Sequence, residues 1–329
     1  MNEKDRALFT AVSGLKWPTQ SRDYLVKMFR DAAVSDRARF IILAGHIVDG
    51  KFLEQEYKDR LQSEIDILKT ELAVELEDRG AENAQTVERL EAQVSRGTFD
   101  RASLKAKKQQ LKDSVVELKN EAKSKMQELS DSFRKRFVDE MSKGLDGFLP
   151  VIPEMRYHIV IAEDVYDKPI GVEILEALQN RRRRNGTNDI VLHGERRDGF
   201  YDTEVKIPVR MEGVDEIRVI VPRRQPWFYR IITSFMQRLI NSFTPRTFSK
   251  EPDLILVGCT GTAAHLPYYE GVPSIAVPAL HKIDEVLSTE NMVGCVSVRA
   301  THCGRNGKVT FVPKFHDFRR TVLHEKEFA

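Results

Sequence analysis

The sequence predicts an α/β fold whose two parts are separated by a long helical hairpin. Three observations carry this prediction. Residues 1–50 alternate strand-like and helix-like patterns, residues 51–148 contain no proline and mix charges of both signs, and residues 149–329 return to short apolar runs between helical patterns. We therefore expect one layered domain formed by 1–50 and 149–329, with 51–148 inserted between its halves as an arm.

The net charge, the cysteine count and the lack of long apolar runs limit the kinds of protein that this chain can be. Of the 329 residues, 41% are hydrophobic and 31% are charged, but the formal net charge is only +2, so affinity for nucleic acid must come from local clusters. The three cysteines, Cys259, Cys295 and Cys303, form no C-x-x-C pair, which argues against a disulfide framework and indicates a reducing interior. The first residues lack a secretory signal, and no run of about 18 apolar residues is present. These features predict a cytoplasmic protein with no membrane segment.

The first fifty residues predict a β-α-β unit. RALFTAVSG (6–14) and FIILAG (40–45) are strand-like, and SRDYLVKMFRDAAVSDRA (21–38) has apolar residues at helical spacing. Such a unit places its two strands in parallel within a buried sheet. The two runs lead into turns at Gly14 and at Gly45–His46.

Residues 51–148 predict two long antiparallel helices with the apolar spacing of a coiled coil. The apolar positions are Ile65, Leu68, Leu72, Leu76, Leu90 and Val94, followed by Leu111, Val115, Leu118, Ala122 and Leu129. Gly97 and a helix N-cap at Asp100 or Ser103 place the reversal near residue 97. We expect this arm to mediate homo-oligomerisation or docking of a protein partner; the alternative is a solvated spacer with no ligand of its own.

The second half predicts further buried strands and two helices. The strands are YHIVIAED, DEIRVIVP, PDLILVG, VPSIAVP, GCVSVRA and KVTFVPKF, and the helices are GVEILEALQNRRRR and YRIITSFMQRLINSF. Several strands end in short turns at what we expect to be one edge of one sheet. In open α/β sheets, binding sites form outside the carboxyl ends of the strands.

The order of these turns resembles the calcineurin-like metallophosphoesterase family. Members of that family show D-x-H, then G-D-x-x-D/N, G-N-H-D/E, a lone His and G-H-x-H, and EPDLILVGCTGTAAHLPYYEGVPSIAVPAL (251–280) is similar to their last stretch. The resemblance implies a layered sandwich of sheets flanked by helices. It also implies a site at the strand ends where two metal ions activate water and stabilise the phosphoryl transition state.

Carried over residue by residue, however, the resemblance implies that the metal centre has been dismantled. The positions that correspond to the family's ligand turns are Gly14, Lys16, His46, Asp49, Glu163, Asp164, Pro222, Cys259 and Gly261. Glycine and proline offer no side-chain donor, and lysine adds a positive charge where a cation would lie. We therefore expect no catalytic residue, no metal and no cofactor. The alternative is one improvised metal site that uses His46, Asp49, Glu163, Asp164 and Cys259.

Two basic clusters predict a surface for nucleic acid. Arg181, Arg182, Arg183 and Arg184 end a predicted helix, where the helix dipole favours cations. No Asp or Glu lies between residues 218 and 250, and this interval interleaves arginine with aromatic residues at Arg223, Arg224, Trp227, Tyr229 and Arg230. That composition is typical of surfaces that follow a phosphate backbone and stack bases. The alternative is that the aromatic residues belong to the core and the arginines are merely solvated.

Three functions remain open from the sequence. The first is a catalytically inactive scaffold or accessory subunit, in a nucleic-acid-processing assembly, whose arm binds a partner or a second copy. The wider family contains such a case, because the B subunits of replicative DNA polymerases keep the fold without the metal ligands; this is an analogy of fold only. The second is a divergent metal-dependent phosphodiesterase or nuclease with an altered site. The third is a purely structural, self-assembling protein.

Overall fold

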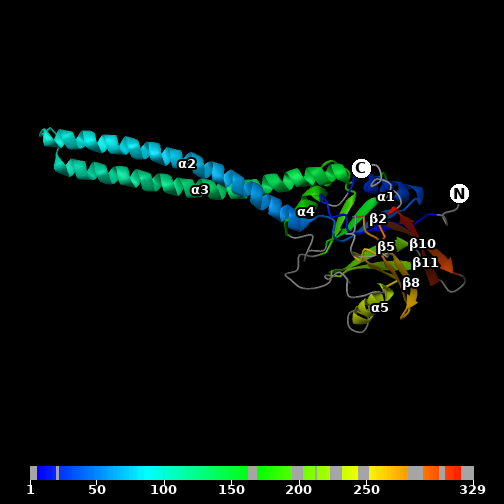
Figure 1. The fold of residues 1–329 in the computed structure, drawn as a ribbon. Coiled ribbons are helices and arrows are strands. Elements are labelled where there is room, and N and C mark those ends of the chain that lie inside the picture. The colour runs from blue at the N-terminus through cyan, green and yellow to red at the C-terminus, as the bar shows by residue number, and fades with distance from the viewer. Residues whose placement is uncertain are drawn as a thin grey trace. The chain divides into compact units, whose positions relative to one another are not determined.

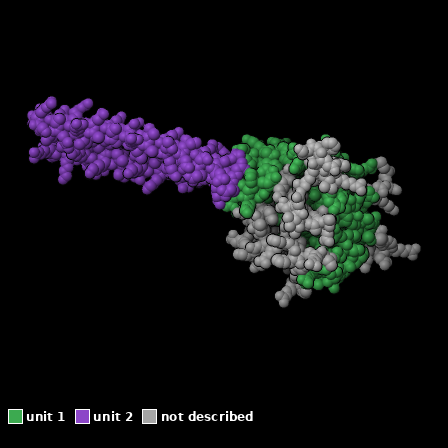
Figure 2. Space-filling model, in the orientation of Figure 1, with its two compact units in different colours: residues 1–54, 138–329 green, residues 55–137 purple. Residues whose placement is uncertain are grey.

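The computed structural model describes residues 6–19, 22–98, 100–161, 169–194, 203–211, 213–222, 232–243, 252–280, 292–303 and 308–319. The chain forms two compact units, which Figure 2 distinguishes by colour: residues 1–54 with 138–329, and residues 55–137. The second unit is shorter than the predicted arm, 51–148, because both ends of that segment cluster with the first unit. None of the helices in the described part of the chain combines the length and apolar character needed to cross a membrane.

The first unit contains two β-sheets. The six-stranded sheet has the order β11-β10-β1-β2-β3-β4, and the five-stranded sheet has the order β5-β6-β7-β9-β8. The strands of the first sheet are β1 (Phe9–Val12), β2 (Phe40–Ala44), β3 (Arg156–Val160), β4 (Ile190–His193), β10 (Gly294–Cys303) and β11 (Lys308–Asp317). Those of the second are β5 (Thr203–Met211), β6 (Val214–Val221), β7 (Leu254–Val257), β8 (Ala264–Tyr269) and β9 (Val272–Ala276).

The predicted β-α-β unit is confirmed. Strands β1 and β2 pair in parallel, with Phe9 opposite Phe40, and helix α1 (Asp23–Ser35) connects them. β3 and β4 continue the parallel order, whereas β10 joins the other side of β1 in antiparallel orientation. Every residue of β1 is buried, as expected for a strand covered on both faces.

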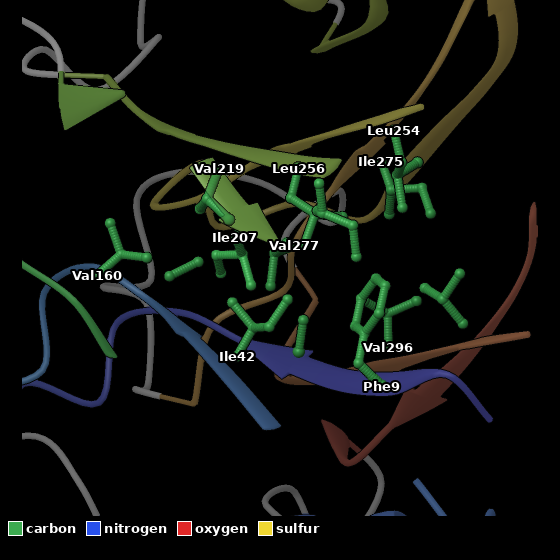
Figure 3. Packing of buried hydrophobic residues seen from close by; sticks show 14 of the residues in the cluster. Phe9, Ile42, Val160, Ile207, Val219, Leu254, Leu256, Ile275, Val277 and Val296 are labelled. Atoms are coloured by element: carbon green, nitrogen blue, oxygen red, sulfur yellow. The ribbon is translucent and has the colours of Figure 1, made fainter. Parts of the chain in front are cut away.

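The core of this unit lies between the two sheets (Figure 3). Side chains from the first sheet, among them Phe9, Ile42 and Val296, point toward side chains from the second sheet, among them Val219 and Leu256. Alternation along each strand explains this arrangement, because residues two apart share a face. Each such side chain stabilises the fold by about 1.5–3 kcal/mol when it is fully buried.

Helices cover the outer faces of the sheets (Figure 1). Helix α5 (Ile232–Phe243) packs Phe235, Met236 and Ile240 against the second sheet, and α1 contacts β1 and β10. Helix α4 (Pro169–Arg184) contacts β4. The result is a mixed α/β architecture of two facing sheets with flanking helices.

The expectation that several of the strand ends lie at one edge of one sheet is wrong, because these ends belong to two sheets. The turns at Gly14 and His46 follow strands of the first sheet, whereas Pro222 and Cys259 follow strands of the second. Three strands, β4, β5 and β8, were also not predicted. β4 has only four residues, β5 is an edge strand that contains Pro208 and a register shift, and β8 is a partly exposed edge strand that contains a proline.

The predicted pair of long antiparallel helices is confirmed. Helix α2 (Gly50–Ser95) and helix α3 (Arg101–Phe148) lie side by side, with ion pairs from Glu64 to Arg136 and from Glu91 to Lys108. The chain reverses at Gly97, whose φ is +70°. Asp100 caps α3, because its carboxylate accepts hydrogen bonds from the backbone N–H groups of Ala102 and Ser103, each at 3.1 Å. Coiled-coil packing itself stays a prediction.

Candidate functional site

The loops that follow β1 and β2 are joined by backbone hydrogen bonds. The N–H of Gly14 donates to the carbonyl oxygen of Gly45 at 3.1 Å, and the N–H of Lys16 donates to the carbonyl oxygen of His46 at 3.0 Å. The carboxyl ends of neighbouring parallel strands lie at the same edge of a sheet, so their loops continue side by side.

The ends of β6 and β7, from the second sheet, reach the same place. A Cβ atom on Gly45 would lie 2.7 Å from a methyl carbon of Val221 and 3.1 Å from Sγ of Cys259. A Cβ atom on Gly258 would lie 2.2 Å from the carbonyl oxygen of Ala44. The two glycines therefore let the sheets approach closely where their strands end, and the loops at Gly14, His46 and Cys259 converge.

Three residues at this convergence adopt the left-handed backbone conformation. The φ angles of Lys16, His46 and Cys259 are +49°, +54° and +57°. Each costs about 1 kcal/mol or more for a residue with a Cβ atom, so the surrounding structure must impose the conformation. All three residues are at most 9% exposed. Backbone geometry of this kind is frequent at active sites and ligand sites, although four other non-glycine residues of the described chain, Arg37, Glu154, Asn188 and Glu270, also have positive φ.

The side chains at the convergence offer few metal donors. Gly14, Gly261 and Pro222 supply none, and Lys16 is cationic. Cys259 donates its thiol to the carbonyl oxygen of Ala44 at 3.3 Å, whereas metal binding would require the thiolate. Across the described ranges, no three His, Cys, Asp or Glu residues are grouped so that they could hold a metal ion.

Asp49, the candidate carboxylate in the loop after β2, makes hydrogen bonds that stabilise local structure. Its Oδ1 accepts the N–H of Phe52 at 3.1 Å, and its Oδ2 accepts the hydroxyl of Thr19 at 2.7 Å. The first of these bonds is the N-cap interaction of α2. The carboxylate thus stabilises the start of the helix.

The other candidate positions are only partly described. Glu163 and Asp164 lie outside the described residues. Pro222 is buried directly after Val221, which packs against Gly45. Gly261 has a φ of +68°, and its carbonyl oxygen accepts the N–H of Met292 at 3.0 Å. Of the candidates that are described, the structure therefore brings Gly14, Lys16, His46 and Cys259 together most directly.

The four consecutive arginines at the end of α4 have different environments. Arg182 is 1% exposed and pairs with Asp146 and Asp189, each at 2.7 Å, so its guanidinium group does not reach a ligand on the surface. Arg181 pairs with Asp139. Only Arg183 and Arg184 are exposed. The second basic cluster, Arg223, Arg224, Trp227, Tyr229 and Arg230, lies outside the described residues.

Sequence reasoning missed a polar network behind the first sheet. Nε2 of His316 lies 2.6 Å from Oδ2 of Asp36 and 3.3 Å from Oγ of Ser297. Ser, His and Asp are the residue types of a catalytic triad. In a triad, however, one ring nitrogen of the histidine contacts the serine and the other contacts the aspartate, whereas here Nε2 of His316 contacts both Ser297 and Asp36. Asp36 lies 280 residues before His316 in the sequence, so no local sequence pattern indicates this network.

Asp36 in this network has a lowered pKa. Burial alone would raise the pKa of its carboxyl group, but hydrogen bonds from Lys314, Ser297 and His316 lower it, together with the charge of His316. The Nζ atom of Lys314 lies 2.6 Å from Oδ1 of Asp36. These contacts tie the end of α1 to β10 and β11, which is a structural role.

Comparison with known proteins adds little. No protein-family model matches the chain, and no curated protein matches it. Among solved structures, it is similar to a single mutant of Vps29 from Entamoeba histolytica, with a TM-score of 0.24 and 12% identity over 56% of this chain and 89% of that chain. Wild-type Vps29 from the same organism, complexed with Zn²⁺, gives a TM-score of 0.25 and 11% identity over 55% and 88%. TM-scores this low do not indicate a function for this chain.

Proposed function

We propose that this chain is a non-catalytic, metallophosphoesterase-like scaffold or accessory subunit whose metal centre has been dismantled. The observation that supports this proposal is the convergence of three buried, left-handed residues, Lys16, His46 and Cys259, at the ends of strands from two sheets. These are positions at which the family resemblance puts metal ligands. The backbone frame of a ligand site remains, while its side chains have changed.

Electrostatics opposes two metal ions at this place. A lysine ammonium within about 5 Å of a divalent cation is opposed by about 7 kcal/mol at an effective dielectric constant of about 20. A dinuclear site compensates its charge with several carboxylates. Here Asp49 is engaged at the start of α2, and Gly14 and Gly261 contribute no donor.

The direct test is metal analysis together with a hydrolysis assay. After incubation with Mn²⁺ or Zn²⁺ and desalting, the purified chain should hold well under one equivalent of metal, and a generic phosphodiester should not be hydrolysed. Stoichiometric metal, with hydrolysis that His46→Ala abolishes, would instead establish the divergent phosphodiesterase.

A gain-of-binding experiment tests the inherited frame itself. The triple variant Lys16→His, His46→Asp, Cys259→His puts three donors on the converging loops, and Asp and His tolerate the left-handed conformation better than most residues. We expect it to bind a divalent cation and to be stabilised by it in a thermal-shift assay. The matched control replaces the same three residues with alanine. A folded triple variant that binds no more metal than this control would count against the family assignment.

The nucleic-acid part of the proposal is supported by the exposed Arg183 and Arg184 and by the sequence of the cluster at 223–230. Binding to single-stranded and duplex oligonucleotides should weaken steeply with salt. Arg183→Glu alone should weaken it more than Lys27→Glu, which makes the same change of charge at an exposed position of α1. Absence of binding even at low salt would favour the purely structural, self-assembling alternative.

A further inference from the structure

The helical hairpin of residues 55–137 divides its charge between its two helices. Residues 55–95 of α2 carry eleven acidic and five basic side chains, a net charge of −6. Residues 101–137 of α3 carry five acidic and eleven basic side chains, a net charge of +6. Within the hairpin the two helices attract each other, but each helix also has flanks whose charged side chains are exposed.

One face of this hairpin has a groove with an apolar floor. Ile67, Leu68 and Glu71 line it from α2, and Lys125 and Leu129 line it from α3. Ile67 is 61% exposed, and Val74, two helical turns further along the same side of α2, is 55% exposed. Large apolar side chains exposed at heptad spacing on a charged helix are typical of a surface that another helix covers.

We propose that a second copy of this chain packs its hairpin against this face and forms a four-helix interface. The inference deepens the proposed scaffold role by naming the partner of the arm. A nucleic acid fits the groove poorly, because the acidic side chains of Glu64, Glu71 and Glu128 line it and repel phosphate.

The charge division selects one symmetric arrangement. A two-fold axis perpendicular to the helices would bring α2 against α2 of the other copy, so that two helices with a net charge of −6 would face each other. A two-fold axis parallel to the helices brings α2 of each copy against α3 of the other, antiparallel, with like charges on the diagonals of the bundle. Every neighbouring pair of helices then has opposite net charge, so electrostatic complementarity sets the register and the orientation.

This arrangement also predicts which side chains meet. Rotation about an axis parallel to the helices does not change the position of a residue along the length of the hairpin. Glu71 and Lys125 line the same groove, so they lie at a similar position along it. Glu71 of one copy therefore lies beside Lys125 of the other, twice per dimer. Ile67 and Val74 of both copies fill the space between the hairpins.

Charge reversal with mixing tests these pairs on the full-length chain. By analytical ultracentrifugation near physiological salt, we expect wild type to dimerise, and Glu71→Lys alone or Lys125→Glu alone to weaken the dimer about tenfold or more. An equimolar mixture of the two variants should regain wild-type association, because each cross-copy pair is then again of opposite sign. Damage within one hairpin could not be repaired by mixing, so absence of recovery would overturn the proposal.

Apolar substitutions provide the second arm of the test. Ile67→Asp with Val74→Asp should abolish dimerisation. Ile67→Asp alone should already weaken the dimer, and its matched control is Val116→Asp, because Val116 is 56% exposed but lies nine residues, or two and a half turns, before Lys125, on the opposite side of α3. Circular dichroism confirms helix content in each variant. Dimers unaffected by the double substitution, equal weakening by the control, or a wild-type chain that stays monomeric to about 100 μM would each refute the inference. Metal content of the same samples reports separately on the dismantled centre.

Discussion

Replacing Arg182 with methionine should destabilise the α/β unit severely, although the residue belongs to a run of arginines that reads as a binding surface. The residue is 1% exposed, and its guanidinium group donates to Asp146 and Asp189 at 2.7 Å. It also donates to the carbonyl oxygen of Leu149, just after α3 ends at Phe148. A single side chain thus joins the end of α3, the end of α4 and the segment that enters β4.

The magnitude follows from what the substitution leaves behind. Asp189 is 6% exposed, and without Arg182 its carboxylate is buried without that compensating charge. Removal of one partner from a buried ion pair costs about 3–5 kcal/mol. Loss of the contact between the guanidinium group and the ring of Tyr157, 6.0 Å away, adds about 0.5–1 kcal/mol. We expect a total of about 3.5–6 kcal/mol, which is a large share of the roughly 5–15 kcal/mol typical of a folded domain.

Urea unfolding followed by tryptophan fluorescence measures this loss, because Trp17 lies in the α/β unit. The control is Arg183→Met, an exposed neighbour that should change the free energy of unfolding by no more than about 0.5 kcal/mol. Adding Asp189→Asn to Arg182→Met should recover about 1–2 kcal/mol by removing the orphaned charge. A loss below about 1 kcal/mol for Arg182→Met, similar to the control, would refute this account of the ion pairs.

Three further predictions concern other buried positions. Gly45→Ala should destabilise the unit by about 2–4 kcal/mol in the same urea assay, because φ is +78° and the new Cβ atom would lie 2.7 Å from Val221; a neutral effect would disprove the close approach of the sheets. Asp36→Asn should lower the free energy of unfolding by about 1–3 kcal/mol at pH 7. Because the pKa of Asp36 is lowered below 3.8, the difference in stability from wild type should shrink as the pH falls below about 4. A difference in stability that does not change with pH would contradict this prediction. Burial, with the charges of His193 and Arg156, lowers the pKa of His158 to about 4. The free energy of unfolding should therefore fall as the pH drops from about 6.5 toward 4. A titration midpoint of His158 near 6.5 by NMR would refute this prediction.

The contact between His158 and His193 gives that last prediction a geometric basis. Their rings stack at 5.0 Å, and Nδ1 of His158 lies 2.9 Å from Nε2 of His193. One nitrogen must donate and the other accept, so protonation of both rings would leave two donors facing each other. The pair sits on the adjacent strands β3 and β4, where each ring is only partly exposed.

Elements with a strong local signal were predictable from the sequence. The apolar periodicity of α1 and of the two long helices, the continuous apolar runs of β2 and β7, and the mainly apolar runs of β1 and β9 are properties of neighbouring residues that any tertiary arrangement must accommodate. Asp100 was one of two caps that the sequence allowed, and only the hydrogen bonds to its carboxylate decided between them. β8 was missed because a partly exposed edge strand with a proline has little signal.

The sequence by itself determined which long segments are helical, where the strongly apolar strands lie, which side chains could donate to a metal, and how charge divides between the two halves of the arm. Only the tertiary structure decided that the strand-end loops come from two sheets and meet at Gly45, that Arg182 is buried while Arg183 is exposed, and that Asp49 caps a helix. The physical reason is that periodicity and composition are local, whereas burial, ion pairing and the approach of loops depend on contacts between residues far apart in the chain.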